Sequence, residues 1–169
     1  MAVEDKFVNA LLAAGKKAPP VAGSGASLLF VGGTFEIAAA DSDLSVYRLA
    51  RLPANAIPVK FDLFSDAAVD ATDVDAGLYK PGVGGAVVDK DLLADGISLG
   101  AGAAITVGGA NAGLTNLGGA DPLAAYGKTL WELLGLSAPN RQDYDLALTA
   151  NTAGGAAGTV SWGFWYALG

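Results

Sequence analysis

The chain has 169 residues, with 10 Lys and Arg against 17 Asp and Glu, no Cys and no His. This length suits one domain, or one domain with an arm. The missing Cys and His exclude disulfides, thiolate metal sites and a Ser–His–Asp triad. The net charge of −7 argues against a nucleic-acid surface, which needs clustered Lys and Arg. Any enzyme here would have to rely on carboxylates, Lys, Tyr or Ser alone. We predict that the protein is not an enzyme and that it has no cofactor, no metal site and no nucleic-acid partner.

Residues 1–27 are predicted to form an arm in front of a domain that spans 28–169. Apolar residues recur at helical spacing over 3–14, namely Val3, Phe7, Val8, Leu11 and Leu12. Gly15 and Pro19 end this short helix, and a Gly/Ser-rich linker follows. Two interpretations stay open. The helix folds back on its own domain, or the arm docks on a partner through Phe7, Leu11 and Leu12.

No targeting or membrane-spanning segment is expected. Glu4 and Asp5 stand where a secretion signal has basic residues. Two uncharged stretches, 96–120 and 146–169, are long enough to span a bilayer. Glycines and Thr/Asn residues in the first, and a strand-like alternation in the second, favour sheet and loop over a membrane span.

From residue 28 the hydrophobic period changes to two, which is typical of β-strands. The strands are expected at 28–31, 34–38, 44–52 (with a bulge), 59–63, 78–79, 86–88, 97–99, 103–107, 144–149 and 158–168. Many short strands with Gly/Asp-rich turns predict a mainly β fold, an antiparallel sandwich or barrel. One short helix interrupts them near 122–134. It has Asp121 as N-cap, Pro122 as first residue and Gly135 as its end.

Three tempting motifs fail or stay weak. Gly96–Gly100 matches the Gly-x-Ser-x-Gly elbow, but Ser98 has no histidine to act as its base. Gly127-Lys128-Thr129 looks like the end of a phosphate loop, yet the position of the earlier glycine is Pro122. The acidic run of Asp66, Asp70, Asp73 and Asp75 lacks the spacing of a calcium loop, so a solvated, extended loop is the favoured interpretation.

The final strand carries the clearest interaction signal. The last 24 residues of the chain, which include this strand, contain no charge. One face is large and apolar, with Val160, Trp162, Phe164, Tyr166 and Leu168. The opposite face carries Trp165 among smaller residues. Strands without charge on either face are usually covered on both sides. We therefore predict that Trp165 lies on a subunit contact.

Several phrases in order resemble the head decoration, or capsid cement, proteins of tailed bacteriophages. They are VYRLARLPANA (46–56), DAGLY (75–79), GAVVDKDL (85–92), GKTLWELLGL (127–136), YDLALT (144–149) and AGTV (157–160). The likeness covers roughly residues 30–168 and leaves the arm outside it. It implies a jelly-roll-like β-sandwich, with no catalytic residues. The body would lie on the outer surface of the phage head, as a homo-oligomer for which a trimer is favoured.

The function expected on this basis is that of a structural virion protein made in the host cytoplasm. It would bind the major capsid protein shell and stabilise it across capsomer boundaries. The alternative is a β-sandwich that binds carbohydrate, or a fibre or adhesion module. Tyr79, Tyr126, Trp131 and Trp165 motivate it, because sugar sites use exposed rings.

Overall fold

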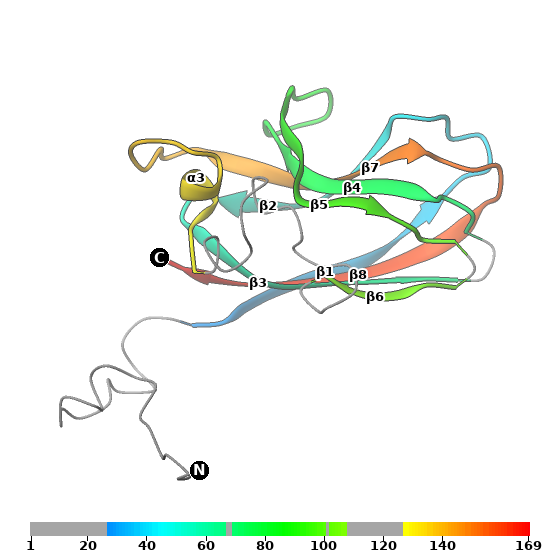
Figure 1. Cartoon of the computed structure of the whole chain (residues 1–169), viewed down its shortest axis with the longest axis horizontal. Helices are drawn as coiled ribbons and strands as arrows, with labels where there is room; N and C mark the ends of the chain where they lie inside the picture. Colours follow the sequence, from blue (N-terminus) through cyan, green and yellow to red (C-terminus); the bar gives the residue numbers. More distant parts are fainter. Residues whose placement is uncertain (1–26, 67–68, 101, 108–126) are drawn as a thin grey trace, which may run out of the picture.

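Two antiparallel sheets lie face to face in the computed structural model, which describes residues 27–66, 69–100, 102–107 and 127–169 (Figure 1). One sheet has the strand order β1-β8-β3-β6 and the other the order β2-β7-β4-β5. The strands are β1 (Leu29–Ile37), β2 (Ser45–Pro53), β3 (Ala56–Ser65), β4 (Asp73–Tyr79), β5 (Val87–Ile97), β6 (Ala104–Val107), β7 (Asp143–Thr152) and β8 (Gly158–Leu168).

The strand order is that of a jelly roll. β1 pairs with β8, β2 with β7, β3 with β6 and β4 with β5, as in one long hairpin. This hairpin is wound so that β8 also pairs with β3, and β7 with β4. Eight strands in this arrangement make the double sheet of the jelly-roll class. The predicted mainly β, antiparallel, jelly-roll-like sandwich is confirmed.

The core fills the space between the two sheets. Alternate residues of each strand point inward, as the period of two requires. Phe61 and Leu63 of β3, Phe164 of β8 and Leu146 and Leu148 of β7 are fully buried there. The Phe61 and Phe164 rings meet edge to face, with centroids 5.8 Å apart. The inner face predicted for the last strand is therefore part of the core.

Several strands are longer than the sequence pattern predicts, among them β3, β4 and β7. The segments expected at 28–31 and 34–38 form one strand, β1, because Gly32 and Gly33 pair with Gly163 and Trp162 of β8. β5 begins in the segment expected at 86–88 and ends at Ile97, the first residue of the segment expected at 97–99, and its pairing with β4 shifts register between Ala76 and Leu78. The predicted bulge in β2 is confirmed, and it lies between Arg48 and Ala50.

One helix, α3 (Leu130–Leu133), is described between β6 and β7. Thr129 is its N-cap, in a capping box with Glu132, and Gly127 has a φ of +78°. The helix predicted near 122–134 therefore begins at Leu130 within the described residues, and Asp121 and Pro122 lie outside them. The arm helix at 3–14 also lies outside the described residues. Within those residues, no helix has the length and apolar character to cross a bilayer.

Candidate functional site

The outer face of the β1-β8-β3-β6 sheet carries aromatic side chains. Trp165 of β8 is paired with Phe30 of β1 on one side and with Lys60 of β3 on the other. The Phe30 and Trp165 ring centroids are 4.8 Å apart, and Lys60 Nζ lies 4.8 Å from the Trp165 ring centroid. Phe30 is 61% exposed, although it belongs to a strand. We call Phe30, Trp165 and Lys60 the aromatic patch.

Glycines let these rings lie against the sheet. A Cβ at Gly32 would be 2.7 Å from Phe30 Cζ, and a Cβ at Gly163 would be 2.9 Å from Phe30 Cε2. A Cβ at Gly163 would also be 3.0 Å from Trp165 Cη2. Gly32 and Gly163 face each other across β1 and β8. The paired glycines thus form a floor that fixes the aromatic patch close to the backbone.

An ion pair holds the lysine of the patch in place. Lys60 Nζ lies 2.6 Å from Asp62 Oδ2, two residues along the same face of β3. The Asp62 side chain is nearly buried, whereas the Lys60 side chain is 45% exposed. A cation above an aromatic face is attracted by the ring quadrupole. The patch is therefore apolar at its centre with an ion pair at its rim, and a polar rim around an apolar centre is typical of a protein contact.

The structure places one of the four residues predicted to contact a partner. Trp165 is half-buried and lies on the outer face, where it meets Phe30 and Lys60. Phe7, Leu11 and Leu12 lie outside the described residues. Phe30 was not among the predicted contact residues. The signal that could have found it is its alternation with Val31 in a segment next to two glycines.

The aromatics of the carbohydrate alternative do not gather into one site. Tyr79 is 5% exposed on the other sheet. Trp131 belongs to α3 and packs against the core, as a helix residue on a sandwich is expected to do. Tyr126 lies outside the described residues. Trp165 therefore stands apart from Tyr79 and Trp131.

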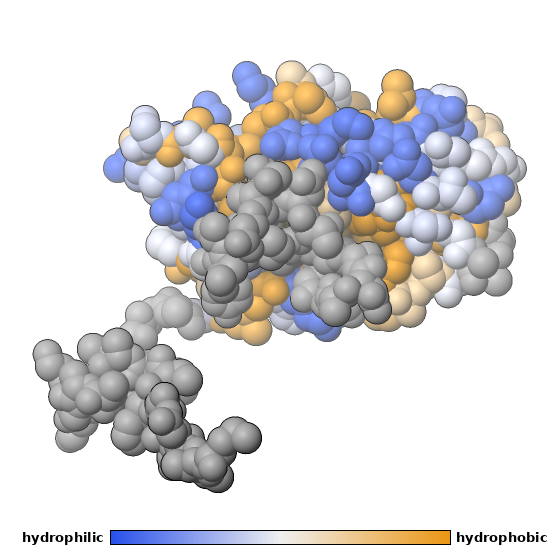
Figure 2. Space-filling view, viewed as in Figure 1, coloured by the Kyte–Doolittle hydropathy of each residue, from blue (hydrophilic) through white to orange (hydrophobic). Residues whose placement is uncertain are grey.

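The outer face of the opposite sheet is polar, and Figure 2 shows a hydrophilic band along its β5 side. Asp145 of β7 is bound by Arg48 at 3.1 Å, by Arg51 at 2.9 Å and by the Gly82 N–H at 2.7 Å. Burial acts to raise the pKa of Asp145, but its bonds with Arg51, Gly82 and Arg48 hold that pKa below its usual value. This cluster binds the loop after β4 to the sheet.

Asp75 of β4 is the centre of a second polar cluster and is fully buried. It accepts hydrogen bonds from Lys90 Nζ at 2.6 Å, Asn151 Nδ2 at 2.7 Å and the Gly96 N–H at 3.2 Å. Burial acts to raise the pKa of Asp75, but these bonds lower it below its usual value. The side chain is thus a structural anion between β4, β5 and β7.

The interpretation of the acidic run as a solvated, extended loop is wrong for Asp73 and Asp75, whereas Asp66 and Asp70 are exposed and lie outside the strands. Asp73 and Asp75 belong to β4. Asp66 accepts a hydrogen bond from the Thr159 N–H, and Asp70 accepts from the Gly155 and Ala156 N–H groups. Backbone N–H donors thus hold the Asp66 and Asp70 carboxylates in place. Among the described residues, no group of three or more acids is arranged to hold a metal ion.

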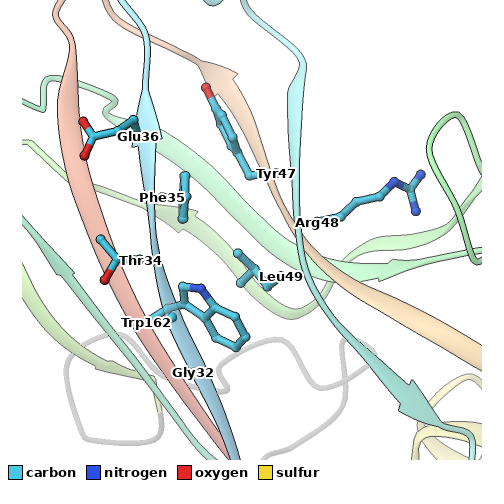
Figure 3. Close-up of a pocket in the computed structure, with 9 residues that line it drawn as sticks. Gly32, Thr34, Phe35, Glu36, Tyr47, Arg48, Leu49 and Trp162 are labelled. Carbon is cyan, nitrogen blue, oxygen red and sulfur yellow. The ribbon is translucent and has the colours of Figure 1, made fainter.

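A pocket of about 480 Å³ opens at the edge of the sandwich, between β1 and β2 (Figure 3). Its apolar lining includes Phe35, Tyr47, Leu49 and Trp162. Phe35 stacks on Tyr47 across the two sheets, with ring centroids 5.0 Å apart. Thr34, Glu36 and Arg48 add polar groups to the lining. The pocket thus extends the space between the two sheets to the edge of the sandwich that β1 and β2 form.

Comparison with known proteins gives a fold match and no family. No protein-family model and no curated protein sequence matches the chain. A chain in the solved capsid of Ralstonia phage GP4 is similar in structure, with a TM-score of 0.51 and 16% identity over 90% of both chains. A chain in the capsid asymmetric unit of cyanophage Pam1 has a TM-score of 0.47 and 18% identity, over 91% of this chain and 94% of that one. The GP4 match shows a shared fold.

Proposed function

We propose that this chain is a structural protein of a phage head. It binds the outer surface of the major capsid protein shell and stabilises the head across capsomer boundaries. The observation that carries the proposal is the jelly roll, which matches a chain in a phage capsid over 90% of both lengths. The resemblance of six sequence phrases to head decoration proteins supports the same class of function.

The aromatic patch is the contact surface that we propose for the shell. Tryptophan is enriched among the residues that dominate binding energy at interfaces. Trp165 and Phe30 meet on the outside of the sheet with Phe30 largely exposed, so a partner could cover them without disturbing the core. We propose that Phe7, Leu11 and Leu12 of the arm supply a second contact. An arm of 27 residues could reach about 90 Å if fully extended.

A cement role requires rigidity and many weak contacts rather than catalysis. Several copies joined in a homo-oligomer, for which we favour a trimer, would engage neighbouring capsomers together. Multivalent attachment raises the total affinity far above that of one contact. We propose no chemical step for this protein. It would be made in the host cytoplasm and would act on the outside of the virion head.

The test is binding to undecorated heads assembled from the major capsid protein of the same virus. Purified protein is mixed with heads, the complex is sedimented, and the unfolding temperature of the heads is measured by calorimetry. We expect co-sedimentation and a higher unfolding temperature. No complex and no thermal gain with the unaltered protein would reject the function.

A pair of variants tests the contact surface. The double variant Phe30→Ala with Trp165→Ala should weaken binding to the heads by at least about tenfold, as loss of an interface anchor does. Val83→Ser is the control, because Val83 is fully exposed in the loop after β4, on the other sheet. Equal binding by the double variant and the control would show that the contact with the shell does not lie on the aromatic patch.

A further inference from the structure

The four edge strands of the sandwich differ in how well they resist further pairing. β2 carries Arg48, Arg51 and Pro53, and β5 carries four charged residues. β6 has only 4 residues. Charges, prolines and short length are the common ways of blunting a sheet edge. β1 has 9 residues, LFVGGTFEI, with Glu36 as the one charge and no proline.

The free side of β1 is open within the described part of the chain. β1 stands at the end of its sheet, with β8 on one side and no described strand on the other. In an antiparallel strand, about half of the backbone N–H and C=O groups point to each side. The outer edge of β1 therefore offers a row of backbone donors and acceptors to another extended chain.

The pocket of Figure 3 lies where the inward side chains of an added strand would point. It is bounded by Phe35 on β1, by Tyr47 and Leu49 on β2, and by Trp162 on β8. Gly33 leaves it open, since a Cβ there would already lie 3.4 Å from Trp162 Nε1. A strand placed beside β1 could thus insert one side chain between the sheets.

Trp162 presents an unused donor to this pocket. The residue is 9% exposed and lines the pocket. No described residue accepts a hydrogen bond from its indole Nε1–H, and this group is open to the pocket rather than buried without a partner. A side chain that combines apolar surface with one hydrogen-bond acceptor would complement both the lining of this pocket and the Trp162 donor.

We propose that an extended segment of another protein binds here by strand addition to β1. Its backbone pairs with the β1 edge, and one inward side chain, such as a threonine, fills the pocket. The threonine methyl group packs against Phe35 and Leu49, and its hydroxyl accepts from Trp162 Nε1. A basic residue of the segment lies beside Glu36, whose carboxylate is exposed. Backbone pairing with side-chain pockets is an established way to recognise peptides.

This site is separate from the aromatic patch and does not depend on the proposed function. Phe30 and Trp165 lie on the outer face of the sheet, whereas Trp162 points into the core layer. Binding at one surface leaves the other available. A chain that failed to bind phage heads could still bind a strand at this edge.

The probe is a fluorescent synthetic peptide of the length of β1, 9 residues, with alternating valine and threonine and a terminal lysine. Binding to the full chain is followed by fluorescence anisotropy. A second peptide carries N-methyl groups at alternate positions, which removes backbone donors and keeps the side chains. We expect binding of the first peptide and none of the second.

Two variants test the pocket. Gly33→Val fills it while keeping the β1 backbone and should weaken peptide binding by about tenfold or more, the effect of about 1.4 kcal/mol. Trp162→Phe removes the donor, keeps a ring, and should weaken binding by up to about tenfold, the range of one hydrogen bond. Gly155→Ala is the control, because nothing lies near its added Cβ.

Three results would overturn the proposal. The first is no binding of the unmethylated peptide. The second is a peptide affinity that neither N-methylation of the peptide nor Gly33→Val changes. The third is a dimer of the unaltered protein in sedimentation velocity that Gly33→Val dissociates, because a second copy would then be the occupant of the β1 edge.

Discussion

Arg48 and Asp145 form an ion pair across β2 and β7, with Arg48 Nη1 3.1 Å from Asp145 Oδ2. The same guanidinium donates to the Lys80 carbonyl at 2.9 Å and to the Gly85 carbonyl at 2.8 Å. Its Cζ also lies 5.1 Å from the centre of the Tyr79 ring. One side chain thus binds the loop between β4 and β5 to the outer face of the sheet.

Replacing this arginine should cost more than replacing its neighbour. Arg48→Ala leaves Asp145, Lys80 O and Gly85 O with fewer donors in a part-buried place, so we expect a loss of about 2 kcal/mol in the free energy of unfolding. Arg51→Ala removes a pair whose arginine is 54% exposed and should cost less than Arg48→Ala, because solvent screens exposed ion pairs. Urea denaturation of both variants measures the difference. Equal losses would contradict the role given to Arg48.

A carboxyl group on β5 should make stability depend on pH. Burial raises the pKa of Asp89 to about 6, and a hydrogen bond and the charge of Asp91 add to the effect. An unfolded aspartate titrates near about 3.9. The folded state therefore binds more protons between these values, and the contribution of Asp89 to stability is lost as the pH rises through about 6.

Asp89→Asn tests this dependence, because an amide resembles the protonated acid. We expect the variant to be more stable than the unaltered protein at about pH 7 and to show a flatter stability profile between about pH 4 and pH 6. Asp75 and Asp145 act in the opposite direction, since their lowered pKa values make stability fall below about pH 4 in both proteins. Parallel profiles between about pH 4 and pH 6 would contradict the assignment to Asp89.

Gly77 marks the closest approach of β5 to β4. A Cβ at this position would collide with the backbone of Asp89 and Lys90. Backbone atoms cannot rotate aside, so Gly77→Ala should cost about 1–3 kcal/mol, as overpacking does. Gly155→Ala is the matched control and should change stability by less than about 0.5 kcal/mol. Thermal unfolding of the two variants decides between these expectations.

The sequence predicts best where a pattern is local. The last strand has the predicted bounds, Gly158–Leu168, because its alternation of large and small residues runs without a break. The sandwich itself follows from many such strands. The glycine pair at 32–33 looked like a break in a strand, but its partners in β8 keep both residues in β1. Pairing between distant strands overrides the weak strand propensity of glycine.

Features that depend on distant partners could not be predicted. Asp75 looks solvated in sequence, yet Lys90 and Asn151 surround it in the fold. Trp165 was expected on a contact surface, but its neighbour Phe30 lies at the far end of the domain sequence and meets it only through the β1–β8 pairing. The pocket behind Trp162 arises from the way two sheets separate at an edge. No single segment of sequence carries that information.

Removing the arm should separate binding from folding. If the arm docks on a partner and not on its own domain, deletion of residues 1–20 should leave the unfolding temperature of the domain within about 3 °C, a change below about 1 kcal/mol. Binding to undecorated heads should weaken if Phe7, Leu11 and Leu12 contact the shell. Calorimetry and head sedimentation measure the two effects. Unchanged binding of the shortened protein to heads would show that the arm does not contact the shell.

Cryo-electron microscopy of undecorated heads mixed with the purified protein tests the central claim most directly. We expect added density on the outer surface at the boundaries between capsomers, into which the jelly roll fits with the β1-β8-β3-β6 sheet and Trp165 toward the shell. Heads that show no added density after mixing would contradict a role as a head-binding structural protein.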